Sequence, residues 1–416
     1  MVMNRHTRPV AMLMALAALT AGCGTADHPA AAAGTLQPPP SLATAMTTAT
    51  GEWAVAVLGG SAASHNNFWQ LFARPARTST WRLVTPPGVA SNGGLVIATP
   101  GAGSVVAGFR PSQRLAFSPL AITRDNGTAW SPGLLDAGLA NVPGALAAAP
   151  RSGRLLALLT NGTAELSETG GTHWARLATL HSLTSSAAGR RCGLRGLSAV
   201  AFSPLGTPLL AGTCSHRSTV GIFAFTGGAW HLAGPALPAS QPGQPTRVLS
   251  LTVAGNGETA LLAVGARRDT MLLGAWSTRS GRWAPSPSLP LGGAQVASVS
   301  VGPRGTIGVV LNGRAGVIIR PGTGWQWLPF LPVGTQALTP GPGPLVDALA
   351  AAGTTFTDWA WTPGSAAWAK KQTLHVRVHY GSSGSATTSS RSRWLRVPPP
   401  ADRTAMAASS AFAVAH

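Results

Sequence analysis

Tryptophan recurs along this chain at nearly regular intervals, and a short strand-like run follows each one. The seven residues are Trp81, Trp130, Trp174, Trp230, Trp283, Trp327 and Trp368. Their separations are 49, 44, 56, 53, 44 and 41 residues, with a mean of about 48. A period of roughly this length is typical of one four-stranded blade of a β-propeller. The spacing predicts an all-β chain with a single β-propeller of about seven four-stranded blades, although six or eight also fit.

Each period divides into short apolar runs separated by turn residues. Residues 144–177 contain the runs GALAAAP, RLLALLT, TAELSETGG and THWARL, and the hairpin signal Asn161-Gly162 separates the second from the third. The next three periods repeat this order. The runs are continuously apolar, which is expected for sheets that are covered on both faces. We interpret each period as four antiparallel strands.

Composition supports this interpretation and excludes a helical design. The 416 residues include 51 glycines and 34 prolines, and only 10% are charged, which is incompatible with long solvated helices. The hydrophobic fraction of 45% is sufficient for a packed core. The chain is therefore expected to fold.

The two ends of the repeat region predict how the ring closes. The first period offers only three apolar runs, whereas residues 404–416 (TAMAASSAFAVAH) have the character of strands. We expect the propeller to occupy residues 51–416 and the C-terminal strand to complete the first blade, because pairing the two ends removes a free sheet edge.

Residues 123–130 (TRDNGTAW) carry a recognisable motif. Thr123, Asp125, Gly127 and Trp130 match the Asp-box, Ser/Thr-x-Asp-x-Gly-x-Thr-Trp, with Ala129 in place of the second threonine. The chain in this respect resembles the sialidase-like propellers with BNR repeats. In those families the boxes lie on the outer rim, so the resemblance implies the fold and says little about chemistry. We expect Asp125 to accept backbone N–H groups within its own hairpin turn and Trp130 to pack between sheets.

A second, degraded Asp-box occupies residues 167–174 (SETGGTHW). It keeps Ser167, Gly171 and Trp174, but Thr169 stands where the aspartate belongs. The same structural role is expected for it.

The N-terminus has the pattern of an export signal. Arg5 and Arg8 precede an apolar run from Val10 to Leu19, and Thr20-Ala21-Gly22 then leads to Cys23. This resembles the lipobox of bacterial lipoproteins, which implies a signal peptide over residues 1–22, cleavage before Cys23 and acylation (palmitate) of that cysteine. A secreted protein that loses Cys23 with its signal remains the alternative. Residues 23–50 are small, polar and proline-bearing, and we interpret them as a lipid-anchored flexible linker.

The remaining cysteines, Cys192 and Cys214, form an even pair in an exported chain, which favours a disulfide. Two strand-like runs between them would bring both to one end of a hairpin. Two unpaired buried thiols are the alternative. No third cysteine or neighbouring histidine completes a metal site, so none is expected. His375 and His379 share a strand face with Arg377, and we interpret them as solvated.

An enzymatic role is the competing class of function. A sialidase needs a Tyr/Glu pair, yet Tyr380 is the single tyrosine and no glutamate follows Glu258. A glycoside hydrolase needs two carboxylates several ångströms apart. The candidates are Glu52, Asp136, Glu165, Glu168, Glu258, Asp269, Asp347 and Asp358. Asp347 lies in the apolar run PLVDALAA and is of most interest, but a satisfied turn or an inter-blade hydrogen bond is the favoured interpretation of it.

Charge points to the cell surface. The formal net charge is +19, which attracts anionic partners such as phospholipid or wall polymer, whereas nucleic acid is not expected as a partner outside the membrane. We predict a monomeric lipoprotein on the outer face of the bacterial cytoplasmic membrane, without a cofactor. Its propeller would be a non-catalytic scaffold for an envelope protein or glycan. The alternatives are a glycoside hydrolase acting in the central pocket and a purely structural envelope protein.

Overall fold

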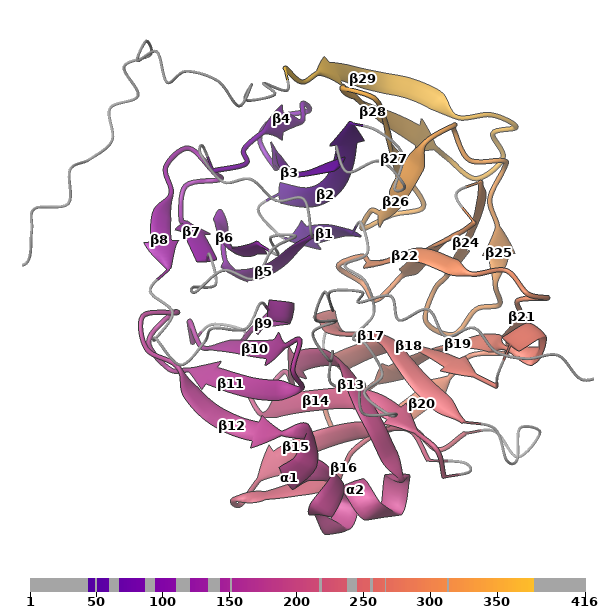
Figure 1. The fold of residues 1–416 in the computed structure, drawn as a ribbon. Helices are drawn as coiled ribbons and strands as arrows, with labels where there is room; N and C mark the ends of the chain where they lie inside the picture. Colours follow the sequence, from indigo (N-terminus) through magenta and orange to yellow (C-terminus); the bar gives the residue numbers. More distant parts are fainter. Residues whose placement is uncertain are drawn as a thin grey trace, which may run out of the picture. The chain divides into compact units, whose positions relative to one another are not determined.

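The computed structural model describes a single repeat body within residues 44–376, with short gaps. The described ranges are 44–48, 51–59, 67–86, 94–109, 120–133, 143–149, 152–216, 219–237, 245–254, 257–265, 267–312 and 314–377. Within them the consecutive strands form seven antiparallel blades arranged around a centre (Figure 1). Short pairings of β1 with β22 and of β14 with β17 join some blades at the hydrogen-bond level, so the seven blades make up five sheets. The prediction of an all-β propeller with about seven four-stranded blades is confirmed.

The first three blades follow the chain without interruption. Blade 1 contains β1 (Thr44–Thr48), β2 (Gly51–Gly59), β3 (Asn67–Pro75) and β4 (Arg82–Leu83). Blade 2 contains β5 (Leu95–Gly101), β6 (Ser104–Phe109), β7 (Leu120–Thr123) and β8 (Ser131–Gly133). Blade 3 contains β9 (Pro143–Ala148), β10 (Leu155–Leu159), β11 (Thr163–Ser167) and β12 (Ala175–Thr179).

The other four blades repeat the same order. Blade 4 contains β13 (Leu194–Phe202), β14 (Pro208–Cys214), β15 (Ile222–Thr226) and β16 (Ala229–Leu232). Blade 5 contains β17 (Thr246–Ala254), β18 (Gly257–Val264), β19 (Met271–Ser277) and β20 (Trp283–Pro285), with β21 (Leu289–Pro290) also paired to β19. Blade 6 contains β22 (Val296–Val301), β23 (Ile307–Leu311), β24 (Ala315–Ile319) and β25 (Gln326–Trp327). Blade 7 contains β26 (Thr335–Pro340), β27 (Val346–Ala352), β28 (Thr355–Trp361) and β29 (Ala369–His375).

Hydrophobic cores lie between successive blades. Leu156 and Leu158 of β10, for example, pack in one cluster with Leu210 and Phe223 of blade 4. All five residues of β10, Leu155–Leu159, are buried, because one face meets blade 2 and the other meets blade 4. This two-sided burial explains why the runs are continuously apolar rather than alternating.

The innermost strand of blade 1 differs from the sequence interpretation. Thr44–Thr48, which were assigned to the linker, form β1 and pair antiparallel with β2 from Thr44↔Val55 to Thr48↔Gly51. The short run TAMTT has no apolar pattern, since the strand sits at the crowded centre where small residues fit. With β1 in place, blade 1 has four strands from consecutive residues. The segment 404–416 lies outside the described residues, so the position predicted for it stays untested.

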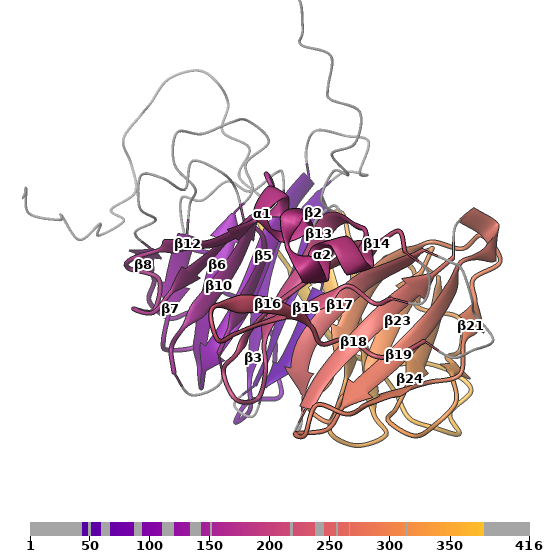
Figure 2. The same ribbon diagram turned by 90° about the horizontal axis from the view of Figure 1, so that it is seen from below.

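Two short helices precede β13 and were not predicted. These are α1 (Leu180–Ser185) and α2 (Ala187–Cys192), and Figure 2 shows them together at the edge of the ring. A capping box between Thr179 and Ser182 starts α1, and Gly193 ends α2 with a φ of 60°. A 3₁₀ turn, η1 (Arg267–Asp269), joins β18 to β19. In the described part of the chain, no helix has the length and apolar character needed to cross a bilayer.

Candidate functional site

The candidate binding site is a central cavity of about 620 Å³ between the innermost strands. Strands β1, β5, β9, β13, β17 and β22 line it, so six of the seven blades contribute. The lining side chains are mostly Ala, Val, Leu, Ser and Thr, with Phe202 as the one aromatic ring among the described residues. No ionisable side chain is among the described residues that line it. The small residues are there because innermost strands converge, which leaves little room for side chains.

Hydroxyl groups give this lining its polarity. Ser198 donates to the carbonyl of Val248 at 2.6 Å and so ties blade 4 to blade 5. Ser300 accepts from the amide of Ala45 at 3.3 Å and so ties the innermost strand of blade 6 to that of blade 1. The other hydroxyls of the lining include those of Thr99, Ser250 and Thr252. The cavity can therefore hold a ligand by apolar contact and by neutral hydrogen bonds.

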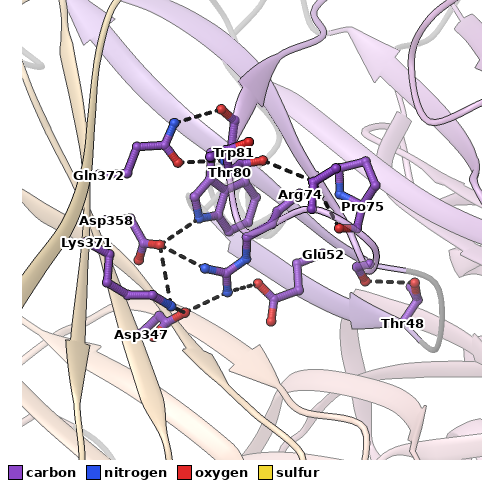
Figure 3. A network of polar contacts seen from close by, with 12 residues as sticks. Thr48, Glu52, Arg74, Pro75, Thr80, Trp81, Asp347, Asp358, Lys371 and Gln372 are labelled. Carbon is purple, nitrogen blue, oxygen red and sulfur yellow. Dashed lines mark hydrogen bonds and ion pairs between the residues drawn. The ribbon is translucent and has the colours of Figure 1, made fainter.

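Among the described residues, a cluster of buried charges lies elsewhere, at the seam between blades 1 and 7 (Figure 3), while the buried Glu165 lies apart from it in β11. Arg74 of β3 lies at the centre of the cluster. Its Nη1 donates to Asp358 Oδ2 at 2.8 Å, and its Nη2 donates to Asp347 Oδ2 at 2.6 Å and also contacts Glu52. Lys371 Nζ donates to Asp347 Oδ2 at 3.0 Å. We call Glu52, Arg74, Asp347, Asp358 and Lys371 the seam cluster.

Burial sets the electrostatics of the seam cluster. Asp347 and Asp358 are only 2% and 1% exposed. Burial and the neighbouring charge of Asp347 raise the pKa of Asp358 to about 7, although Arg74 acts in the opposite direction. Burial likewise raises the pKa of Glu52. Burial alone would lower the pKa of Arg74, but the carboxylates around it outweigh that effect and raise it.

The seam also contains neutral contacts that hold the ring closed. The Gln336 side chain bonds to both the amide and the carbonyl of Val57, at 2.6 and 2.8 Å. Gln372 does the same to Trp81, at 2.6 and 2.9 Å. Each glutamine side chain thus pairs with the backbone of blade 1 in the way that a residue of a neighbouring strand would. The rings of Phe72 and Phe356 stack across the seam, with centroids 4.1 Å apart.

Of the two roles that the sequence favoured for Asp347, a turn or an inter-blade contact, this geometry shows the inter-blade contact. Asp347, Asp358 and Glu52 all share Arg74 and lie outside the lining of the central cavity. Arg74 is the residue that unites them. Sequence reasoning missed the cluster as a whole, since Arg74 and Asp347 are 273 residues apart.

The Asp-box at residues 123–130 forms the turn between β7 and β8. Asp125 Oδ1 accepts the amides of Thr128 and Ala129 at 3.0 and 2.9 Å, and it accepts the hydroxyl of Thr123 at 2.8 Å. The hydrogen bonds that Asp125 accepts from the backbone amide of Ala129 and from the hydroxyl of Thr123 lower its pKa. Gly127 has a φ of 80°, and an added Cβ would meet Val84 at 2.5 Å. Trp130 is half-buried beside the core between blades 1 and 2.

The degraded Asp-box forms the corresponding turn between β11 and β12. Here the Thr169 hydroxyl accepts the amide of His173 at 3.0 Å, which is the function of the missing carboxylate. Ser167 accepts the amide of Gly171 at 2.9 Å, and the buried Trp174 donates to the carbonyl of Gly171 at 3.1 Å. The motif keeps its geometry without its acid.

Indole groups fasten neighbouring blades elsewhere in the ring. Trp283 donates to the carbonyl of Ala233 at 2.7 Å, and Trp325 donates to that of Pro287 at 2.8 Å. In blade 6 the sequence assigned this position to Trp327, but Trp327 is 56% exposed. Trp325, two residues earlier, makes the inter-blade contact instead, since its indole donates to a carbonyl of blade 5.

The disulfide is formed as predicted. Cys192 and Cys214 are bonded, with their Cα atoms 5.0 Å apart. Cys192 is the last residue of α2 and Cys214 is the last of β14, whose hairpin partner β13 begins at Leu194. The bond therefore pins the two helices to blade 4.

Several other sequence candidates fall outside this arrangement. Cys23, Asp136, His379 and Tyr380 lie outside the described residues. His375 is exposed on β29, where its ring is 3.3 Å from the hydroxyl of Thr355. Among the residues that the structure describes, no three His, Cys, Asp or Glu side chains form a group suited to a metal ion.

Comparison with known proteins assigns no family to this chain. No protein-family model matches the chain, and no curated protein matches its sequence. Ycf48 from Cyanidioschyzon merolae has a TM-score of 0.46 and 14% identity, over 79% of this chain and 94% of that one. The GH74 xyloglucanase from Xanthomonas campestris has a TM-score of 0.49 and 15% identity, over 78% of this chain and 53% of that one. A streptogramin B lyase has a TM-score of 0.47 and 10% identity, over 76% of this chain and 92% of that one.

These likenesses concern the fold alone. By their own topology the described residues form a seven-bladed β-propeller in which every blade is built from consecutive strands.

Proposed function

We propose that this protein is a lipid-anchored cell-envelope scaffold whose central cavity binds an uncharged part of an envelope protein or a glycan. The observation that supports this proposal is the lining of the cavity. Small apolar residues and hydroxyls surround about 620 Å³ of space, and this lining contains no ionisable side chain in the part of the chain described. Ligand pockets commonly have volumes of about 300 to 1,000 Å³, so the cavity is of suitable size.

The distribution of carboxylates supports binding over glycoside hydrolysis. Hydrolysis requires an acid and a second carboxylate on either side of a bound sugar, roughly 5 to 10 Å apart. In the described residues, the three carboxylates that lie together are Glu52, Asp347 and Asp358, and Arg74 and Lys371 hold them in ion pairs within the blade 1–7 seam. A sugar in the central cavity would meet hydroxyl and alkyl groups instead.

Filling the cavity tests where the ligand binds. Ser250 lies on β17 in the cavity lining, so Ser250→Trp should occupy the space. Ser288 is exposed on the outer side of blade 5, so Ser288→Trp is a matched control. Ligands would be found with the wild-type protein by glycan-array screening and by crosslinking in native membranes. Loss of binding with Ser250→Trp and retention with Ser288→Trp is the expected result, whereas equal binding by both would contradict a central site.

The lipid anchor has its own test. Cys23→Ala should abolish incorporation of a labelled fatty acid and move the protein from the membrane fraction to the soluble or secreted fraction. Continued labelling of the Cys23→Ala chain would contradict attachment at this cysteine. Cys192 and Cys214 are bonded to each other, so they do not compete for the label.

A further inference from the structure

Three exposed apolar residues lie close together in the chain where blade 6 ends: Trp327 is the last residue of β25, and Phe330 and Val333 lie on the connection to blade 7. Their exposed fractions are 56%, 86% and 75%. Single exposed apolar residues are common on protein surfaces, but three within seven residues of one segment are not scattered. We call these three residues the rim patch.

The segment that carries the rim patch is held firmly from beneath. Leu328 and Leu331 alternate with the exposed residues and are 8% and 1% exposed, within the core between blades 6 and 7. The amide of Leu328 donates to Gly316 O at 2.9 Å, and that of Leu331 donates to Arg314 O at 3.1 Å. Since both buried neighbours are fixed, the apolar side chains are presented outward in a set arrangement.

Strand topology places this connection on a particular face of the ring. Each blade has four antiparallel strands, so its fourth strand ends on the face where its first strand begins. We call this the entry face. Phe330 and Val333 lie between β25 and β26 and therefore belong to it. Thr44 also belongs to it, since β1 runs parallel to β22.

The entry face is therefore where the chain that follows Cys23 joins the ring. Twenty residues separate Cys23 from Thr44. A random coil of that length has an r.m.s. span of roughly 25 Å, which is comparable to the size of one blade. A lipid at Cys23 would thus keep the entry face close to the bilayer, and this step rests on the proposed lipid attachment.

The charge of this face suits an anionic surface, but the described connections of the opposite face carry as many exposed arginines, so it is the rim patch that distinguishes the two faces. Its described connections carry exposed arginines in α2, at the start of β13, in η1 and beside Leu331; these are Arg190, Arg191, Arg195, Arg268 and Arg314. The one exposed carboxylate in the same described connections is Asp269. Of these arginines, Arg314 is nearest to the rim patch, since its carbonyl accepts the amide of Leu331. Basic side chains on the same face as exposed tryptophan and phenylalanine are the combination that binds the interface of anionic membranes.

We propose that the rim patch inserts into the headgroup region of an anionic phospholipid bilayer and that the entry-face arginines bind its surface. The lipid at Cys23 then supplies one membrane attachment and the rim patch supplies a second. Two attachments fix the orientation of the ring, because a single flexible tether leaves it free to turn. The opposite face of the ring is then directed away from the bilayer.

A single-site fluorescent label tests this orientation. In the full chain with Cys23→Ser, Val333→Cys introduces one free thiol, since the other two cysteines form a disulfide. An environment-sensitive dye on this thiol is mixed with vesicles of equal phosphatidylglycerol and phosphatidylcholine that contain a nitroxide-labelled lipid. Leu205→Cys in the same background is the control, because Leu205 is 71% exposed in the turn between β13 and β14, on the opposite face.

The expected result is a blue shift and quenching of the label at position 333, and little change at position 205. Adding Trp327→Ser and Phe330→Ser to the Val333→Cys chain should lower vesicle binding about tenfold or more, because two large apolar side chains leave the interface. Vesicles of phosphatidylcholine alone should also bind more weakly.

Three outcomes would overturn the proposal. One is equal quenching at positions 333 and 205, and another is no response at 333. The third is a blue shift of the label at position 333 that increases with protein concentration in the absence of vesicles, which would indicate that a second copy of the chain binds the rim patch. Because the chain in this experiment carries no lipid at residue 23, failure here is separate from failure of lipid attachment.

Discussion

The indole Nε1 of Trp81 donates to Asp358 Oδ2 at 3.0 Å and so joins the first blade of the ring to the last. Both residues are 1% exposed. Trp81 belongs to the same series as Trp283 and Trp325, whose indoles bond to backbone carbonyls of the preceding blade. At the seam the acceptor is a carboxylate instead of a carbonyl, so the bond between blades 1 and 7 is sensitive to the charge of Asp358.

Replacing Trp81 with phenylalanine should weaken the seam. The ring would still fill much of the space, but Asp358 would lose one buried donor, which costs about 1 to 3 kcal/mol in the free energy of unfolding. Urea unfolding followed by circular dichroism measures this change. Trp327→Phe is the matched control because Trp327 is exposed. A smaller loss for Trp81→Phe than for Trp327→Phe would contradict the assigned role.

Removing the cation at the centre of the seam cluster should be more damaging. Arg74→Met leaves Asp347, Asp358 and Glu52 close together with only Lys371 nearby, and breaking a buried ion pair typically costs about 3 to 5 kcal/mol. The measurement is again urea unfolding, with Arg77→Met as the control, since Arg77 is exposed. Lower pH should partly restore the stability of Arg74→Met, because protonation removes the repulsion. An unchanged midpoint for Arg74→Met would show that the cluster does not hold the seam.

The raised pKa of Asp358 predicts a specific pH dependence. In the unfolded chain this carboxyl titrates near its usual value of 3.8, whereas in the folded protein its pKa is about 7. The folded state therefore binds the proton more tightly, and the contribution of Asp358 to stability is present below about pH 4 and is lost as the pH rises to about 7.

Comparison with Asp358→Asn isolates this contribution. Between about pH 4 and about pH 7 the stability of the wild-type protein should fall relative to that of Asp358→Asn, and at higher pH the difference should be constant. Thermal unfolding at half-unit steps of pH would provide the two curves. Parallel curves across this range would show that the carboxyl of Asp358 has an ordinary pKa.

The disulfide between Cys192 and Cys214 should stabilise the protein by restricting the unfolded chain. The residues are 22 apart, for which chain-entropy arguments give roughly 3 kcal/mol. The variant with both Cys192→Ala and Cys214→Ala should lose about this amount, and a reducing agent should lower the midpoint of the wild type but not that of the variant. Equal midpoints for oxidised wild type and variant would contradict a stabilising bond.

The blades could be predicted from the sequence because their signals are local. Runs such as Leu155–Leu159 are apolar throughout, and turns such as Asn161-Gly162 lie directly between them. The disulfide followed from the same hairpin logic. The strand β1 was missed because TAMTT has neither an apolar run nor a turn at its start, and its pairing with β2 is visible only in three dimensions.

The seam cluster and the rim patch show the limit of such reasoning. Asp347 was identifiable as an acid in an apolar strand, but its partner Arg74 is 273 residues away and belongs to another blade. Trp325 and Trp327 lie two residues apart, so the repeat spacing fits either. Only the path of the chain after β24 decides that the indole of Trp325 reaches blade 5 and that Trp327 remains exposed.

The seam has a consequence for how the gene could be rearranged. In the described residues no strand is shared between blades 1 and 7, and a single backbone hydrogen bond, from Gly59 N to Gly353 O, crosses between them. The junction between blades 7 and 1 thus depends mainly on side chains, whereas a short strand pairing between β14 and β17 joins blades 4 and 5. A circularly permuted protein would have its present N- and C-termini joined and its chain opened between two other blades. The seam cluster would then connect two blades that follow one another in the chain, and no longer the first blade with the last.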